Sequence, residues 1–181
     1  VVPFKKPTTE ELDHDFLWRV HKEVPAKGQI AIFNRSHYED IIAVRVKKIF
    51  PDPVWKRRYK HVLDFESMLA EEGTVIIKLF LNISKAEQKK RLESRLQDPD
   101  KLWKFCMDDL DDRNRWDEFQ TAYQDLIEKT STPEAPWYII PADRKWYRNL
   151  VVARLMVEKL RHLQLSLPTP NFDPASIIIP D

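Results

Sequence analysis

The segment at residues 34–40, Asn-Arg-Ser-His-Tyr-Glu-Asp, concentrates polar and charged side chains directly after a short apolar run at residues 29–33. An apolar run of this kind, closed by polar residues, is typical of a buried parallel strand that ends at a site. In open α/β sheets, ligands bind beyond the carboxyl ends of the strands. We therefore predict that chemistry takes place here and that Arg35 takes part in it. The alternative is that Arg35 only pairs with Glu39 or Asp40 at the start of a helix.

A second charged segment covers residues 89–104, where six basic residues accompany three acidic ones. Arg91 and Arg95 are four residues apart, so they share one side of a predicted helix. We expect this pair to lack an acidic partner four residues away, which would leave both guanidinium groups free for a ligand. Lys101, Lys104 and Arg113 follow. The alternative interpretation is an ordinary solvated helix surface.

Composition limits the classes of protein to consider. The chain has 181 residues, enough for one domain with a full core, and 33% of them are charged. A net charge of +1 argues against a nucleic-acid partner. The single cysteine, Cys106, excludes a disulfide framework and a cysteine-based zinc site, and it predicts a cytoplasmic protein. No apolar run reaches membrane-spanning length, so no membrane partner is expected.

Glycine is scarce, since Gly28 and Gly73 are the only two in the chain. A loop that binds phosphate through its backbone N–H groups needs several glycines. This sequence contains no such loop, so any phosphate site must be built from basic side chains.

The hydrophobic pattern predicts four short strands separated by helices. The strands are expected at residues 1–4, 29–33, 74–81 and 137–141; the helices are expected at residues 9–20, 41–46, 55–72, 85–96, 116–127 and 145–163. Capping-box sequences begin the first and fourth of these helices, and Gly73 ends the third. Strands that alternate with helices predict an α/β fold with a parallel sheet. The proline-rich tail at residues 166–181 is predicted to lie along the surface or to be disordered.

Several separate motifs, in the same order, resemble the type-2 polyphosphate kinases. They are residues 33–40, 83–88, 95–105 with the pattern Asp-Pro-x-Lys-x-Trp-Lys, 135–137 and 140–146. The resemblance implies a three-layer P-loop kinase-like α/β fold with a parallel sheet. A kinase-like domain would cover residues 1–165, with a helical lid at about residues 84–118. The implied activity is phosphoryl transfer between inorganic polyphosphate and nucleotides, and residues 34–40 resemble the subgroup that acts on AMP and ADP.

Two departures from the family pattern lead to further expectations. The family carries a glycine-rich Walker A loop ahead of the residues matched here, so we expect its strand to be missing and this chain alone to be inactive. We then expect the lone chain to be unstable, or the strands at residues 29–33 and 74–81 to pair directly or to borrow a strand from a neighbour. The Walker B aspartate corresponds to Asn34. Mg²⁺, the cofactor implied by the resemblance, would therefore be held mainly by phosphates and waters, with Glu39 and Asn34 as protein ligands.

The resemblance and the chemistry of phosphoryl transfer together assign roles to the basic residues. The residues expected to be catalytic are Arg35, at a strand end, and Arg91 and Arg95, in a lid that excludes water. The residues expected to bind polyphosphate are Lys5, Lys6, Lys101, Lys104, Arg113 and Lys145. Trp103 is expected to pack against a nucleotide base or, alternatively, to anchor the lid to the body.

The sequence thus predicts a cytoplasmic, homo-oligomeric polyphosphate:AMP/ADP phosphotransferase whose partners are polyphosphate, AMP, ADP and ATP. Two alternatives are retained. One is an ATP-dependent nucleoside monophosphate kinase of the same fold, and the other is a non-catalytic module that binds polyanions.

Overall fold

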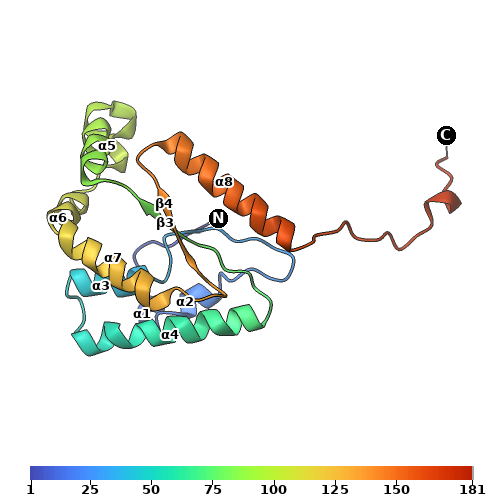
Figure 1. Cartoon of the computed structure of the whole chain (residues 1–181), viewed down its shortest axis with the longest axis horizontal. Coiled ribbons are helices and arrows are strands. Elements are labelled where there is room, and N and C mark those ends of the chain that lie inside the picture. Colours follow the sequence, from blue (N-terminus) through green and yellow to red (C-terminus); the bar gives the residue numbers. More distant parts are fainter. Residues whose placement is uncertain (181) are drawn as a thin grey trace.

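The computed structural model describes residues 1–180, which form an α/β body with an extended tail (Figure 1). In chain order the elements are β1 (Val2–Pro3), α1 (Thr9–Asp13), α2 (Trp18–His21), β2 (Phe33–Asn34), α3 (Glu39–Val46), α4 (Asp52–Glu71), β3 (Lys78–Asn82), α5 (Lys85–Gln97), the 3₁₀ helix η1 (Pro99–Lys104), α6 (Asp108–Asn114), α7 (Trp116–Thr130), β4 (Trp137–Pro141), α8 (Lys145–His162) and the 3₁₀ helix η2 (Pro174–Ser176). The alternation of strands and helices confirms the predicted fold class.

The four strands form two parallel pairs. Val2 of β1 lies opposite Phe33 of β2, and β3 pairs with β4 from Lys78 opposite Trp137 to Asn82 opposite Pro141. Within the described residues β2 and β3 belong to separate sheets. The expectation that these two strands pair directly with each other is therefore wrong.

The predicted strand at residues 29–33 is shorter and more exposed than expected. Only its end forms β2, while the side chains of Ile30 and Ile32 are 67% and 58% exposed. On one side Val2 donates its backbone N–H to the carbonyl of Ile32 at 2.8 Å. No strand among residues 1–180 pairs with the other side. The prediction of a strand buried on both faces was wrong because burial depends on a neighbour that these residues do not provide.

The first predicted helix is interrupted. Its capping box is confirmed: the Thr8 N–H donates to Glu11 Oε2 at 2.8 Å, and the Glu11 N–H donates to Thr8 Oγ1 at 3.2 Å. However, α1 ends at Asp13, and a single helix through residue 20 is not formed. The Asp15 carboxylate accepts the Leu17 N–H at 2.9 Å, a local bond that competes with the helical pattern.

The remaining helices follow the sequence prediction closely. Helix α4 ends before Gly73, which has a φ of 90° and therefore occupies the conformation that glycine adopts most easily. Ser84 accepts the Glu87 N–H at 3.0 Å and so caps α5.

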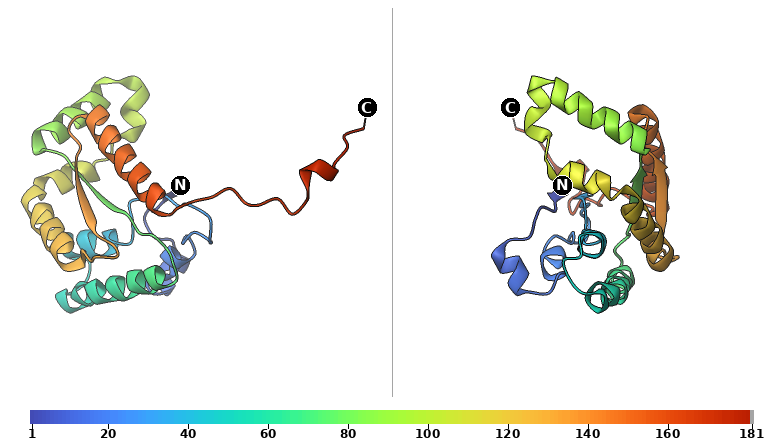
Figure 2. Two further views of the ribbon diagram at one scale, coloured as in Figure 1. Left: turned by 45° about the vertical axis from the view of Figure 1, so that its right-hand side comes forward. Right: turned by 90° about the vertical axis from the view of Figure 1, so that its left-hand side faces the viewer.

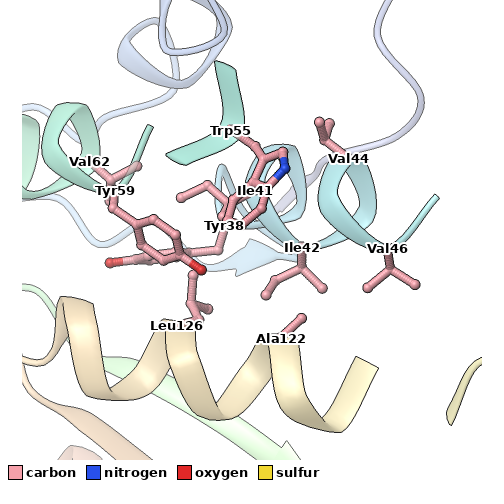
Figure 3. Close-up of a cluster of buried hydrophobic side chains, with 10 residues drawn as sticks. All are labelled: Tyr38, Ile41, Ile42, Val44, Val46, Trp55, Tyr59, Val62, Ala122 and Leu126. Carbon is pink, nitrogen blue, oxygen red and sulfur yellow. The ribbon is translucent and has the colours of Figure 1, made fainter. Parts of the chain in front are cut away.

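The main core lies between α3, α4 and α7 (Figure 3). Ile41 and Ile42 of α3, Val62 of α4 and Leu126 of α7 are almost completely buried. Tyr38 packs in the same cluster, one residue before α3 begins. A smaller cluster of Phe4, Val20 and Phe65 lies beneath β1. The start of α3 is thus fixed by the main core.

Residues 84–118, the predicted lid, form α5, η1, α6 and the first residues of α7, and they arch away from the ends of β3 and β4 (Figure 2). This lid segment is attached to α3: Lys47 pairs with Asp112 at 2.7 Å, and Arg115 donates to the Val46 carbonyl at 2.8 Å. The tail at 166–180 projects from the end of α8 and does not lie along the body (Figure 1). None of the described helices combines the length and apolarity that crossing a membrane requires.

We expect Leu126→Ala to lower the free energy of unfolding by about 2–5 kcal/mol, because it leaves a cavity where α7 meets α3 and α4. Urea denaturation followed by far-UV circular dichroism would measure the change. Leu12→Ala is the matched control, since the Leu12 side chain is 65% exposed. Equal destabilisation by the two substitutions would contradict this description of the core.

Candidate functional site

A shallow pocket lies at the carboxyl ends of β1 and β2. It has a volume of about 310 Å³ and is lined by Pro3, Phe4, Lys5, Lys6, Asn34 and Arg35. Because the two strands are parallel, their carboxyl ends meet at one edge, and Pro3 lies directly opposite Asn34. The structure thus brings together four of the residues predicted from the sequence to form a site, namely Lys5, Lys6, Asn34 and Arg35.

The pocket is positively charged. Its lining contains three cations and no acidic side chain. Within residues 1–180, the side chains of Lys5, Lys6 and Arg35 make neither a hydrogen bond nor an ion pair with the protein. Cations with free donors on one side of a pocket suit an anion with several oxygens, such as a phosphate chain.

The backbone of Arg35 adopts an unusual conformation, with a φ of 61°. Residues other than glycine rarely adopt this left-handed region, and strained conformations of this kind cost on the order of 1–3 kcal/mol. Such a conformation persists only where the surrounding structure imposes it. The contacts of the turn that carries Arg35 are therefore part of the site.

The alternative role of Arg35, an ion pair with Glu39 or Asp40, is not formed within residues 1–180: its charge acts on the pKa of Glu39 without direct contact, and Asp40 is bound by other arginines. Arg19 approaches the Asp40 carboxylate at 3.5 Å, and Arg58 donates to the Asp40 carbonyl at 2.5 Å. Burial raises the pKa of Asp40, and the charges of Arg19 and Arg58 oppose that rise. Arg35 is thereby left available to a ligand.

Arg19 joins the two sides of the pocket, a role that was not predicted. Its guanidinium group is buried and donates to the carbonyl of Lys5 at 3.0 Å, while also approaching Asp40 on α3. The end of β1 and the start of α3 are thus held by one side chain. A sequence signal existed: Arg19 lies three residues after Phe16, which places it on the inward side of a predicted helix.

The predicted metal ligands form an incomplete site. Glu39 lies in the first turn of α3, where burial raises its pKa and the nearby Arg35 charge opposes the rise. Asn34 is exposed at the end of β2. No three metal-binding side chains cluster among residues 1–180. Mg²⁺ commonly takes only one or two carboxylates and completes its shell with water and substrate phosphates, so these residues fit such partial coordination.

In the lid segment Arg91 connects α5 to the body. Its Nε donates to Glu87 at 2.7 Å, and its Nη2 donates to the carbonyls of Ala142 and Asp143 at 2.6 and 3.1 Å. The expectation that Arg91 lacks an acidic partner is therefore wrong: Glu87 lies four residues earlier, on the same side of the helix. Arg95 pairs with Asp109 at 3.1 Å.

The other predicted site residues also have local partners or stand free. Arg113 donates to the Lys85 carbonyl at 2.7 Å, and Lys101 pairs with Asp98. Trp103 is 79% exposed and bonds to its own turn through the Asp100 carbonyl. It is therefore not an anchor between the lid and the body.

Two further predicted residues are exposed. Lys104 lies 4.9 Å from the centre of the Trp103 ring, and Lys145 begins α8. None of the contacts described for the lid cations or Lys145 involves the pocket. The structure thus groups four predicted residues at one site and leaves the lid cations separate from it.

Comparison with known proteins agrees with the fold and the motifs. The chain matches the family described as Polyphosphate kinase 2 (PPK2) over residues 1–167. It is 53% identical to an AMP/ADP-polyphosphate phosphotransferase of Meiothermus ruber, over 99% of this chain and 67% of that protein. It is 39% identical to an ADP-polyphosphate phosphotransferase of Rhodopseudomonas palustris, over 93% of this chain and 62% of that protein.

A crystal structure of Polyphosphate Kinase 2 from Arthrobacter aurescens TC1 superposes with a TM-score of 0.93 at 49% identity, covering 97% of this chain and 62% of that one. This likeness confirms the P-loop kinase-like α/β fold implied by the resemblance. The chain thus spans about two thirds of the length of these relatives. On these matches, the chain belongs to the polyphosphate kinase 2 family.

Proposed function

We propose that this protein transfers phosphoryl groups between inorganic polyphosphate and AMP or ADP. The observation that carries the proposal is the pocket at the carboxyl ends of two parallel strands, where Lys5, Lys6 and Arg35 meet and have no side-chain partner among the described residues 1–180. The names of the relatives from M. ruber and R. palustris, which specify AMP/ADP and ADP as nucleotides, support the substrate class.

Phosphoryl transfer depends on positioning and charge neutralisation more than on covalent catalysis. In the proposed reaction Arg35 holds the transferring phosphate through its planar fork, and Lys5 and Lys6 bind neighbouring phosphates of the chain. Mg²⁺ is the proposed cofactor; it would neutralise phosphate charge while bound to Glu39 and, more weakly, to Asn34.

The lid segment is proposed to supply further cations. Arg91 and Arg95 hold carboxylates in the present conformation, so their part in transfer requires them to exchange Glu87 and Asp109 for phosphate oxygens. Lys101, Lys104, Arg113 and Lys145 are proposed to bind more distant phosphates, and Trp103 to pack against a base. Closure of such a segment would exclude water that could hydrolyse the anhydride.

The phosphate loop of the family is proposed to reside on a further parallel strand. The segments that lead into β2 and β3 expose apolar side chains, among them Ile30, Ile32 and Val75. A strand placed between β2 and β3 would cover these side chains and pair with both edges.

The proposal has four further parts. The protein is proposed to be cytoplasmic and homo-oligomeric, to use ATP as a further nucleotide, and to have no nucleic-acid partner.

The decisive experiment compares phosphoryl donors. The complete encoded protein, incubated with AMP or ADP and Mg²⁺, should form ADP or ATP from polyphosphate. An ATP-dependent monophosphate kinase would instead form ADP only when ATP is supplied. A polyanion-binding module would bind polyphosphate without changing the nucleotide. Chromatographic separation of nucleotides distinguishes the three outcomes.

Arg35→Ala should lower kcat by about 10³-fold or more, the scale found when an arginine that contacts a transferring phosphate is removed. Arg35→Lys should retain part of the activity, because it keeps the charge and loses the fork. Arg57→Ala is the matched control, since Arg57 is exposed on α4 and makes no side-chain bond within residues 1–180. Equal turnover by the Arg35→Ala and wild-type proteins would remove Arg35 from the proposed mechanism.

Arg91→Ala and Arg95→Ala should each reduce turnover strongly while the protein remains folded. Because Arg91 also ties α5 to residues 142–143, its substitution should in addition increase proteolysis within the lid segment. Lys89→Ala on the same helix is the control, as its ion pair with Glu93 is exposed. Wild-type turnover in both arginine variants would contradict this prediction and would show that the lid arginines form an ordinary solvated surface.

A further inference from the structure

Next to the turn that carries Arg35 lies a cluster of buried polar side chains that has no part in the reaction as described above. Tyr38, Glu66 and Lys78 are 5%, 4% and 6% exposed, and His37 and Thr130 are buried beside them. These residues come from the start of α3, from α4, from the start of β3 and from the end of α7.

The bonds within this cluster are short and complementary. The Lys78 ammonium group donates to Glu66 Oε2 at 2.7 Å, to the Thr130 carbonyl at 2.6 Å and to the Tyr38 hydroxyl at 3.1 Å. The Tyr38 hydroxyl donates to Glu66 Oε1 at 2.6 Å. An ammonium group has three donors, and all three are used, so the geometry of Lys78 is fully determined.

The electrostatics favour the ionised carboxylate. Burial alone would raise the pKa of Glu66, but His37, Lys78 and Tyr38 together hold it below its usual range. Burial lowers the pKa of Lys78, and the charge of Glu66 opposes that change. Buried ion pairs of this kind are often no more stabilising than apolar residues of similar size. Stability is therefore a weak reason for this pair to be present.

The cluster is connected directly to the turn that carries Arg35. Tyr38 lies three residues after Arg35 and occupies the position directly before the first residue of α3. Within this turn the Tyr38 N–H donates to Ser36 Oγ at 3.4 Å, and the Glu39 N–H, one residue further on, donates to the Ser36 carbonyl at 3.0 Å. One side of this turn thus faces the pocket, and the other is bonded to the cluster. The left-handed conformation of Arg35 requires such an external constraint.

We propose that Glu66, oriented by Lys78, is a positioning residue: through the Tyr38 hydroxyl it holds the turn at residues 34–38 and thereby fixes Arg35 at the pocket. This inference rests on the proposed function for what Arg35 binds. The competing interpretation is that the cluster only stabilises the fold, in which case its effects on activity would follow its effects on stability.

The first test removes a single hydroxyl. Tyr38→Phe keeps the ring in the core (Figure 3) but breaks its bond to Glu66. We expect kcat with polyphosphate to fall between about 10- and 100-fold, the effect of displacing a catalytic group by roughly 1 Å. Tyr59→Phe is the matched control, because the Tyr59 hydroxyl is buried in the same core and has no hydrogen-bond partner within residues 1–180. Wild-type kcat in Tyr38→Phe would overturn the proposal.

The second test asks whether the effect passes through Arg35. If the cluster acts by placing Arg35, Tyr38→Phe should cause little further loss of kcat/KM in an Arg35→Ala background, so the two losses should be strongly non-additive. A purely structural role predicts losses that multiply. The same cycle, measured on the dissociation constant for polyphosphate by calorimetry, provides a second readout. Multiplicative losses in both measurements would refute the positioning role.

The third test separates activity from stability. Glu66→Leu and Lys78→Met should each lower the urea midpoint, because each leaves a buried charge without its partner. The double variant should recover part of the midpoint but not kcat, since the Tyr38 hydroxyl then has no acceptor at position 66. Recovery of both would show a structural role only. A wild-type protein that transfers no phosphate from polyphosphate would instead refute the proposed function, and the binding cycle would still test the cluster.

Discussion

The ion pair between Lys78 and Glu66 joins parts of the fold that are far apart in the sequence. Lys78 begins β3, Glu66 lies on the inner side of α4, and the Thr130 carbonyl that completes the ammonium shell ends α7. Tyr38 connects this group to the start of α3. Since a buried charge that loses its partner is strongly destabilising, this ion pair fixes the positions of α3, α4, α7 and β3 relative to one another. The position of the pocket relative to the core depends on this arrangement of the four elements.

Arg19 provides a second constraint of the same kind. It binds the Lys5 carbonyl on the strand side and the Asp40 carboxylate on the helix side. The cations that face solvent, Lys5 and Arg35, therefore lie on backbone segments that are fixed by buried cations. Preorganised donors of this type need little rearrangement when an anion binds, which is the property that electrostatic catalysis requires.

The sequence predicted features that depend on nearby residues and missed those that depend on distant ones. The capping box at Thr8 and the helix end at Gly73 were predicted correctly because each is determined within a few residues. The exposure of Ile30 was not predicted, because an apolar composition indicates that a strand is suited to burial but does not indicate whether a neighbouring strand is present to bury it. Grouping Lys5 with Arg35 required only the parallel arrangement of two strands.

Two of the missed features had sequence signals. Lys78 interrupts an otherwise apolar stretch at residues 74–81, and a lysine in a buried strand needs an acidic partner. Glu66 follows Phe65 and Val62 on the inner side of α4 and could have been identified as that partner. Glu87, four residues before Arg91, is likewise a sequence signal for the ion pair that the structure shows. Which acid meets which base across the fold could not be read from spacing alone.

The pocket and the lid segment differ in how their cations are satisfied, and this difference bears on the proposed selectivity for polyphosphate. Within residues 1–180 Lys5 and Arg35 have no ion pair, whereas Arg91 and Arg95 already hold carboxylates. A ligand that recruits the lid arginines must compete with Glu87 and Asp109. A single phosphate offers one anionic group for that exchange. A phosphate chain anchored at Arg35 presents its remaining phosphates at high effective concentration, so each further exchange becomes intramolecular. On the proposed function, the carboxylate partners of the lid would therefore favour closure over a long polyanion and disfavour closure over a short one.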